Sequence, residues 1–275
     1  MTSHTAAIHP APGTPCWIEL ATLNEPAAQT FYTGLFGWRY HSKSDPATGT
    51  YTIANLGGVP VAGLYRTLPN QQPAWLLHLA VANVRSAVGW ATTLGGTVLL
   101  DPVDIPGRGS IAHVRDPSGA IVVLWEAPDG WAFGTDQPGM FSAADLNTWD
   151  GDAVDGFYPT MFGFTSPQVG YAPGIDYVEW RLDEPVVYRN VMGDEYHSTT
   201  PPHWLIYLAA DPRHGTGALA MRAEALGGTV ILPPFDTGYG RAAVLADPSG
   251  ARFAITDRSR RDPDWRAEVE DPDDD

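Results

Sequence analysis

Two short segments with nearly the same sequence carry different polar side chains at the same place. WLLHLA at 75–80 contains His78, and WLIYLA at 204–209 contains Tyr207. A histidine changes its charge near neutral pH and can act as an acid or a base, and a tyrosine hydroxyl can also transfer a proton. His78 and Tyr207 are therefore the candidate catalytic residues. The alternative is that each is a core residue whose polar atoms are satisfied by its neighbours.

Two glycine-flanked loops, GRG at 107–109 and GYG at 238–240, carry further side chains that could contact a ligand. Arg108, Tyr239 and Arg241 are suited to an anionic or phenolic group, and the flanking glycines would allow the loops to move. Gly-x-Gly by itself is a weak motif, because neither a phosphate-binding loop nor a dinucleotide fingerprint accompanies it.

A third group of polar residues lies on a hairpin predicted over 175–191 and on the loop after it. Tyr188 and Glu179 belong to the hairpin, and His197 and His203 follow on a proline-bounded loop. Their spacing matches no compact metal motif such as H-E-x-x-H. We interpret most of them as polar side chains on an exposed loop without a catalytic or metal-binding role. Tyr188 is kept as a candidate ligand contact.

The chain repeats itself with an offset that drifts from 126 to 132 residues. The matching segments are FYTGLFGW at 31–38 with FYPTMFGF at 157–164, LGGTV at 94–98 with 226–230, and DPSGA at 116–120 with 247–251. Order and period hold over most of the sequence, which indicates a tandem duplication. The repeat predicts two similar domains, over 10–132 and 133–258, between a flexible N-terminus at 1–9 and an acidic flexible tail at 259–275.

Each copy divides into two units of the same pattern. A short apolar strand is followed by a helix with an apolar stripe, and then by three short strands. The predicted helices are 25–36, 84–94, 151–162 and 216–226. The high content of 29 glycines and 25 prolines fits many short strands joined by turns.

Four such units, with the repeated motifs above, resemble the vicinal oxygen chelate superfamily, which includes glyoxalase I, bleomycin-resistance proteins and extradiol dioxygenases. The tandem form is similar to a two-domain group common in actinobacteria. The resemblance implies an α+β fold in which four βαβββ modules pair into two glyoxalase-like domains with curled mixed sheets. Each sheet would form a half-open cup that holds a ligand and, in many members, a divalent metal.

The resemblance also places the metal ligands of the family, and the residues found there cannot coordinate a cation. The aligned positions are Trp17 and Ala143 on the first strands, Leu76 and Leu205 on the strands that begin the second units, and Val123 and Ala254 on the last strands. A metal site in this fold needs about three to four N or O donors. We therefore expect neither a metal nor another cofactor.

The same alignment predicts which side chains line the cups. Trp17, Leu76, Val123 and Leu205 would supply apolar contacts to a ligand. Because side chains alternate along a strand, His78 would share the inward face of Leu76. Tyr207 would share that of Leu205 for the same reason.

Composition limits the possible partners. Lys+Arg 16 against Asp+Glu 32 gives a net charge of −16, which disfavours nucleic acid and anionic membranes as partners. One cysteine, Cys16, excludes an intrachain disulfide and a multi-cysteine metal site. The sequence shows neither a membrane-length apolar run nor a signal peptide, so we expect a cytoplasmic protein.

Three functions follow, of which the first two fit the sequence better. The first is metal-independent binding of a small aromatic or hydrophobic metabolite, for sequestration and resistance or in secondary metabolism. The second is a metal-independent isomerase, cyclase or lyase of secondary metabolism that uses the same cavity. The third, a metal-dependent glyoxalase or dioxygenase, is disfavoured by the missing ligands. The expected partner is a small molecule, and the duplicated chain could work as a monomer or a homodimer.

Overall fold

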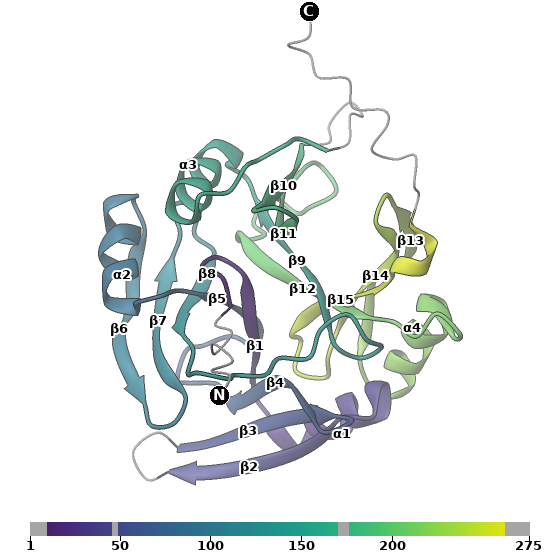
Figure 1. The fold of residues 1–275 in the computed structure, drawn as a ribbon. Helices are drawn as coiled ribbons and strands as arrows, with labels where there is room; N and C mark the ends of the chain where they lie inside the picture. Colours follow the sequence, from purple (N-terminus) through teal and green to yellow (C-terminus); the bar gives the residue numbers. More distant parts are fainter. Residues whose placement is uncertain (1–9, 46–48, 170–175, 262–275) are drawn as a thin grey trace, which may run out of the picture.

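A computed structural model describes residues 10–45, 49–169 and 176–261, which form two mixed sheets with two helices attached to each (Figure 1). The first sheet has eight strands in the order β2-β3-β4-β1-β5-β8-β7-β6. Its elements are β1 (Pro15–Thr22), α1 (Glu25–Phe36), β2 (Arg39–Asp45), β3 (Gly49–Leu56), β4 (Val59–Arg66), β5 (Ala74–Ala80), α2 (Val84–Thr93), β6 (Thr97–Ile105), β7 (Gly109–Arg115) and β8 (Ile121–Glu126).

The second sheet has seven strands in the order β10-β11-β9-β12-β15-β14-β13. Its elements are β9 (Phe141–Thr148), α3 (Gly151–Phe162), β10 (Tyr177–Arg181), β11 (Pro185–Val191), β12 (His203–Ala209), α4 (Gly215–Ala225), β13 (Thr229–Thr237), β14 (Gly240–Ala246) and β15 (Arg252–Asp257), followed by the short 3₁₀ helix η1 (Arg258–Arg260). In each sheet the two units join through one antiparallel pair of first strands, β1 with β5 and β9 with β12. The expected α+β fold with paired modules is confirmed.

One unit differs from the predicted β-α-β-β-β pattern. After α3, the described residues contain two strands, β10 and β11, and the place of a further outer strand is taken by two isolated bridges, Thr165 with Arg181 and Gln168 with Val178. Residue 175, the predicted start of the hairpin, lies outside the described residues. The seven-stranded sheet is therefore one strand narrower than its counterpart.

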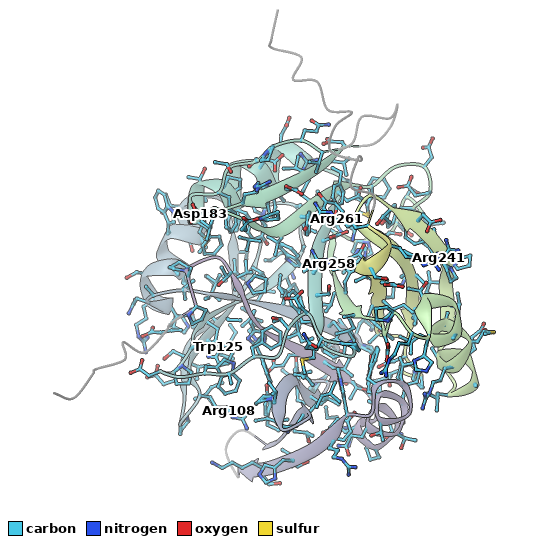
Figure 2. The ribbon with its side chains drawn as sticks, turned by 45° about the vertical axis from the view of Figure 1, so that its right-hand side comes forward. Arg108, Trp125, Asp183, Arg241, Arg258 and Arg261 are labelled. Carbon is cyan, nitrogen blue, oxygen red and sulfur yellow. The ribbon has the colours of Figure 1, made fainter. Side chains whose placement is uncertain are left out.

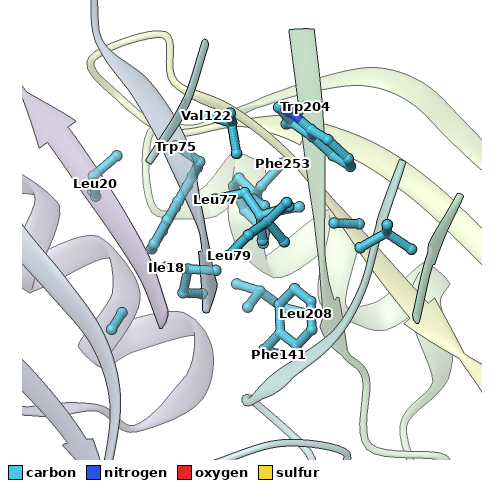
Figure 3. Close-up of a cluster of buried hydrophobic side chains, with 14 of the residues drawn as sticks. Ile18, Leu20, Trp75, Leu77, Leu79, Val122, Phe141, Trp204, Leu208 and Phe253 are labelled. Atoms are coloured by element: carbon cyan, nitrogen blue, oxygen red, sulfur yellow. The ribbon is translucent and has the colours of Figure 1, made fainter. Parts of the chain in front are cut away.

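The helix-covered faces of both sheets meet in a single hydrophobic core. Ile18 and Leu77 of the first sheet and Leu208 and Phe253 of the second belong to one buried cluster (Figure 3). Residues next to these along the strands, such as Trp17 beside Ile18, point to the opposite face, because side chains alternate along a strand. We call this opposite face of the first sheet the first cup and that of the second sheet the second cup.

The repeated sequence motifs join the two copies to each other. The Tyr158 hydroxyl on α3 donates to Oδ2 of Asp116 at 3.0 Å, and the Tyr32 hydroxyl on α1 reaches Oδ2 of Asp247 at 3.4 Å. Asp116 and Asp247 are the aspartates of the two DPSGA turns. Each copy therefore places a helix tyrosine on a turn of the other copy, so the two repeated motifs contact each other reciprocally.

The predicted domain boundaries fall between the sheets. β8 ends at Glu126 and β9 begins at Phe141, while the position of the boundary at 132 and 133 stays a prediction. Residues 1–9 and most of the predicted tail at 259–275 lie outside the described residues. Of the helices that the structure describes, none has the length and apolar character needed to span a bilayer.

Candidate functional site

A buried carboxylate lies at the same place in each cup. Glu19 on β1 and Asp145 on β9 are 126 residues apart, the offset of the repeat, and their side chains face the same way as Trp17 and Ala143, two positions earlier in each strand. Only 8% of Glu19 and 7% of Asp145 are exposed. A buried carboxylate requires hydrogen-bond partners, and both residues have them.

In the first cup, Glu19 is held by a tyrosine and a histidine. The Tyr51 hydroxyl donates to Oε1 of Glu19, and Nε2 of His78 lies 3.2 Å from Oε2. The indole N–H of Trp17 donates to the Tyr51 hydroxyl oxygen at 2.9 Å. The Arg108 guanidinium lies 3.8 Å from the centre of the Tyr51 ring, so a cation covers the outer side of this tyrosine.

In the second cup, Asp145 is held by two tyrosines. The Tyr177 hydroxyl donates to Oδ1 at 3.1 Å, and the Tyr207 hydroxyl donates to Oδ2 at 2.8 Å. Tyr188 stacks on Tyr177 with 5.7 Å between ring centres, and Tyr239 packs 4.9 Å from Tyr188. Four tyrosine rings therefore surround or approach this carboxylate.

The two cups contain the same constellation with different chemistry. The equivalent residues are Glu19 and Asp145, Tyr51 and Tyr177, His78 and Tyr207, and Arg108 and Tyr239. The predicted catalytic residues His78 and Tyr207 are thus both direct partners of a carboxylate. Sequence reasoning missed the carboxylates Glu19 and Asp145 and their tyrosine partners Tyr51 and Tyr177.

A signal for the missed residues was present in the sequence. The same-face rule that leads from Leu76 to His78 also leads from Trp17 to Glu19 and from Ala143 to Asp145. The repeat offset then marks these two carboxylates as equivalent. Both carboxylates lie one inward position beyond the aligned ligand positions Trp17 and Ala143.

The pKa of Glu19 is shifted downward although the residue is buried. Desolvation alone would raise it, but the electrostatic interaction with His78 and hydrogen bonds from His78 and Tyr51 outweigh burial. His113, on the neighbouring strand β7, has its pKa lowered to about 4, first by burial and then by His78. The first cup therefore holds a carboxylate that favours its ionised form beside hydrogen-bonding partners.

The pKa of Asp145 shifts in the opposite direction. Burial raises it from 3.8 to about 6, and the hydrogen bonds from Tyr207 and Tyr177 offset only part of this effect. Burial and the adjacent carboxylate raise the pKa of Tyr207 well above its ordinary value, so this hydroxyl stays protonated. A carboxyl group that titrates near 6 can accept and return a proton close to neutral pH.

Large aromatic side chains fill the first cup. Trp17 is 1% exposed and packs against Trp125, Trp131 and Phe133, with ring centres 6.4, 5.0 and 5.5 Å away. Trp131 and Phe133 come from the segment between the two sheets. The ring of Trp17 is therefore covered by the chain itself, and its role as a ligand wall stays a prediction.

The second cup has small residues at the positions of two of these tryptophans. Ala143 replaces Trp17, and Thr256 replaces Trp125. Ala143 and Tyr207 are half-buried, whereas Trp17 and His78 are buried. The second cup is thus the more open of the two.

A cavity of about 240 Å³ opens at the outer end of the second cup. Its lining is Glu184, Pro185, Tyr188, Tyr239, Arg258 and Arg261. A neighbouring cavity of about 420 Å³ shares Glu184, Pro185, Tyr188 and Arg258 with it. Figure 2 shows Arg258 and Arg261 close to each other where the chain leaves β15. Two residues predicted as ligand contacts, Tyr188 and Tyr239, therefore line a real opening.

The remaining predicted contacts lie elsewhere. Leu76 and Val123 are buried in the first sheet, and Leu205 packs with Val244 and Ala254 beneath Tyr207. Arg241 donates to Asp236 at 2.7 Å and is absent from the lining of the 240 Å³ cavity. None of these positions has been tested as a ligand contact, so they stay predictions.

Gly109 allows its loop to pack closely against the backbone at the end of β8. Gly109 has φ +78°, and a Cβ there would lie 1.9 Å from the carbonyl oxygen of Glu126. The indole N–H of Trp125 also donates to the carbonyl oxygen of Arg108 at 2.7 Å, which ties the loop to β8. The backbone approach therefore requires a residue without a side chain at this position.

The donor set of neither cup fits a divalent metal. Within residues 10–45, 49–169 and 176–261, no group of three or more histidine, cysteine, aspartate or glutamate side chains is close enough to hold an ion. Around Glu19 the only such direct partner that the structure shows is His78, and around Asp145 the direct partners are tyrosines. Protein metal sites in general use about three or more such donors.

The fold and paired cups define a protein of the vicinal oxygen chelate superfamily. Solved structures with this fold include an extradiol ring-cleaving dioxygenase from B. fuscum (TM-score 0.64, 15% identity, 96% of this chain and 77% of that chain). Another is a Mn(II)-bound glyoxalase from Novosphingobium aromaticivorans (TM-score 0.62, 14% identity, 93% of this chain and 90% of that chain). At these identities the similarity shows the fold alone.

Closer relatives are found by sequence. The putative glyoxylase CFP32 of Mycobacterium tuberculosis is 34% identical over 250 residues, covering 88% of this chain and 94% of its own. The anthracycline biosynthesis protein DnrV of Streptomyces peucetius is 33% identical over 265 residues, covering 90% and 94%. No family model matches the sequence. The chain belongs to the glyoxalase-like family of these relatives.

Proposed function

We propose that this chain binds a small aromatic metabolite in the second cup, without the metal of the family, in the cytoplasm and as part of secondary metabolism. The observation that carries the proposal is the opening lined by Tyr188 and Tyr239 above a cup in which Ala143 and Thr256 replace tryptophans. Tyrosine rings offer flat apolar surfaces to an aromatic guest.

Two further observations support this proposal. One relative is named for anthracycline biosynthesis, and an aromatic guest agrees with that name. The donor set around Asp145 consists of tyrosine hydroxyls, which favours organic hydroxyl or carbonyl groups over a cation as its partners. A role in sequestration or resistance would use the same binding surface, and either a monomer or a homodimer could provide it.

A metal-independent isomerase, cyclase or lyase is the second candidate, and a specific observation favours it. The pKa of Asp145, about 6, suits a general base that works near neutral pH. Tyr207, which donates to Asp145 at 2.8 Å, would keep the carboxylate oriented and could return a proton. Binding is common to both functions, so it is tested first.

Exchange of the wall residues between the cups tests the proposed site. Titration calorimetry with 2-naphthol should show binding to the wild-type chain, and Ala143→Trp should weaken it at least tenfold, because the indole fills the cup as Trp17 fills the other. A loss of this size corresponds to about 1.4 kcal/mol. Circular dichroism and the melting temperature show whether the variant is folded.

Trp17→Phe is the matched control, since it changes the equivalent wall of the first cup and keeps an aromatic ring there. It should bind 2-naphthol as the wild type does. Absence of binding to the wild-type chain, or equal affinity in a folded Ala143→Trp, would contradict the proposed site. Loss of binding in Trp17→Phe alone would move the site to the first cup.

A further inference from the structure

We call the residues that line the 240 Å³ cavity the mouth of the second cup. This mouth brings positive charge together on a strongly acidic protein. The chain carries a net charge of −16, yet two of the six residues that line the 240 Å³ cavity are arginines. The general field of such a protein repels anions, so a local pair of guanidinium groups changes what can enter. Arg258 also lines the larger neighbouring cavity.

Packing holds both arginines at this mouth. Arg258 donates through Nη1 to Oδ1 of Asp136 at 3.2 Å and to the carbonyl oxygen of Ser142 at 3.4 Å. The Arg261 guanidinium lies 5.9 Å from the centre of the Tyr239 ring, within the range of a cation–π contact. Each guanidinium has five N–H donors, so these contacts leave further donors to bind an anion.

One acidic side chain, Glu184, shares the lining of the 240 Å³ cavity, and the neighbouring cavity is also lined by Asp183 and by Asp136, the ion-pair partner of Arg258. Glu184 is 90% exposed in its side chain and lies 4.0 Å from Arg181, so its charge is directed to solvent and partly balanced there. The other carboxylates of the cup lie deeper and are occupied. Asp145 accepts from Tyr177 and Tyr207, and Glu179 accepts from Tyr239 and Arg181.

A continuous line of rings leads inward from the arginines. Arg261 lies over Tyr239, Tyr239 packs against Tyr188, and Tyr188 stacks on Tyr177, whose hydroxyl donates to Asp145. This order runs from positive charge, through flat apolar surface, to a carboxylate. A guest with a negative group at one end would be attracted at the mouth and repelled at the floor when Asp145 is ionised.

We infer that the ligand of the second cup is an aromatic anion, a carboxylate or phenolate, held with its negative group between Arg258 and Arg261 and its ring against Tyr188 and Tyr239. This inference rests on the proposed function and specifies its substrate class and orientation. The floor of the cup then receives the uncharged end of the guest, next to Asp145 and Tyr207.

Two probes of the same shape and different charge test the inference. Binding of 2-naphthoate and of neutral 2-naphthylmethanol is measured by titration calorimetry at pH 8, with 50 and 300 mM salt. Wild-type chain should bind 2-naphthoate several-fold more tightly, and salt should weaken only this probe, because mobile ions screen exposed charges. The variant Arg261→Gln should bind 2-naphthoate about threefold more weakly, the size typical of an exposed ion pair.

Arg260→Gln is the matched control. Arg260 is the neighbouring residue in sequence, is exposed, lies 4.0 Å from Asp257 and does not line the cavity. It should leave both affinities unchanged. Equal binding of the two probes, or equal effects of the two substitutions, would overturn the inference while the proposed aromatic site stands. Failure of both probes to bind would overturn the proposed site itself, and with it the inference.

Discussion

Replacement of Asp116 by alanine is expected to lower the free energy of unfolding by about 3 kcal/mol. Oδ1 of Asp116 accepts from the backbone N–H groups of Ser118, Gly119 and Ala120, and Oδ2 accepts from the hydroxyl of Tyr158 in the other copy. The substitution leaves a buried hydroxyl and the turn donors without their acceptor. Urea unfolding followed by tryptophan fluorescence measures the change.

A double-mutant cycle isolates the contact between the copies. Tyr158→Phe removes the same hydrogen bond from the other side, so the effects of Asp116→Ala and Tyr158→Phe should be less than additive by about 1 kcal/mol. Asp101→Ala, at an exposed aspartate on β6, is the control and should change stability little. If Asp116→Ala lowers the free energy of unfolding no more than the control does, the DPSGA turn does not stabilise the contact between the two copies.

Replacement of Asp145 by asparagine is expected to stabilise the protein above pH 6, by up to about 3 kcal/mol. The folded chain raises the pKa of this carboxyl from 3.8 to about 6, so the native state holds its proton more tightly than the unfolded state. Stability is therefore lost as the pH rises from about 4 to about 6, and the loss persists above pH 6. The difference between the two pKa values corresponds to about 3 kcal/mol.

The comparison of wild type and Asp145→Asn over pH removes the contribution of all other groups. Urea unfolding at pH 4.5, 6 and 8 should show a difference that grows with pH in favour of the variant. A buried charge that destabilises the fold is expected at a catalytic or binding site rather than in a structural core. A variant that is equally stable or less stable at pH 8 would show that the Asp145 carboxylate is a structural group.

Much of the fold could be predicted from the sequence because the repeat carries strong local signals. The helices at 25–36 and 151–162 begin at Asn24 and Asp150, whose side chains cap them, and end at Gly37 and Gly163. The sheet order also follows once the units are assigned to the superfamily. The outer edge of the third unit escaped prediction, since a break in strand pairing depends on tertiary contacts.

Several residues of the candidate site can be named from the sequence, and their roles stay predictions. His78, Tyr207, Tyr188 and Tyr239 are placed at the carboxylates or at the mouth. Periodicity alone could not show that Trp131, from the segment between the sheets, enters the first cup, because that depends on the path of the chain in three dimensions. The difference between a filled and an open cup is therefore a structural finding.

The positions of the two arginines at the mouth could not be predicted from periodicity either. Both arginines follow the last strand: Arg258 is the last residue of the predicted second domain, and Arg261 lies at the beginning of the predicted acidic tail. Their position beside Tyr188 and Tyr239 follows from the packing of η1 against β14. Sequence spacing gives no indication of this contact, which joins residues about 20 to 70 positions apart.

Occupation of the second cup by an aromatic guest can be tested by observing where the guest binds. A protein sample with labelled tyrosine and tryptophan rings, mixed with 2-naphthol, allows intermolecular nuclear Overhauser effects to be measured. We expect effects between naphthol protons and the rings of Tyr188, Tyr207 and Tyr239. Effects to Trp17 and Trp125 instead, or to neither set, would contradict this assignment of the binding site.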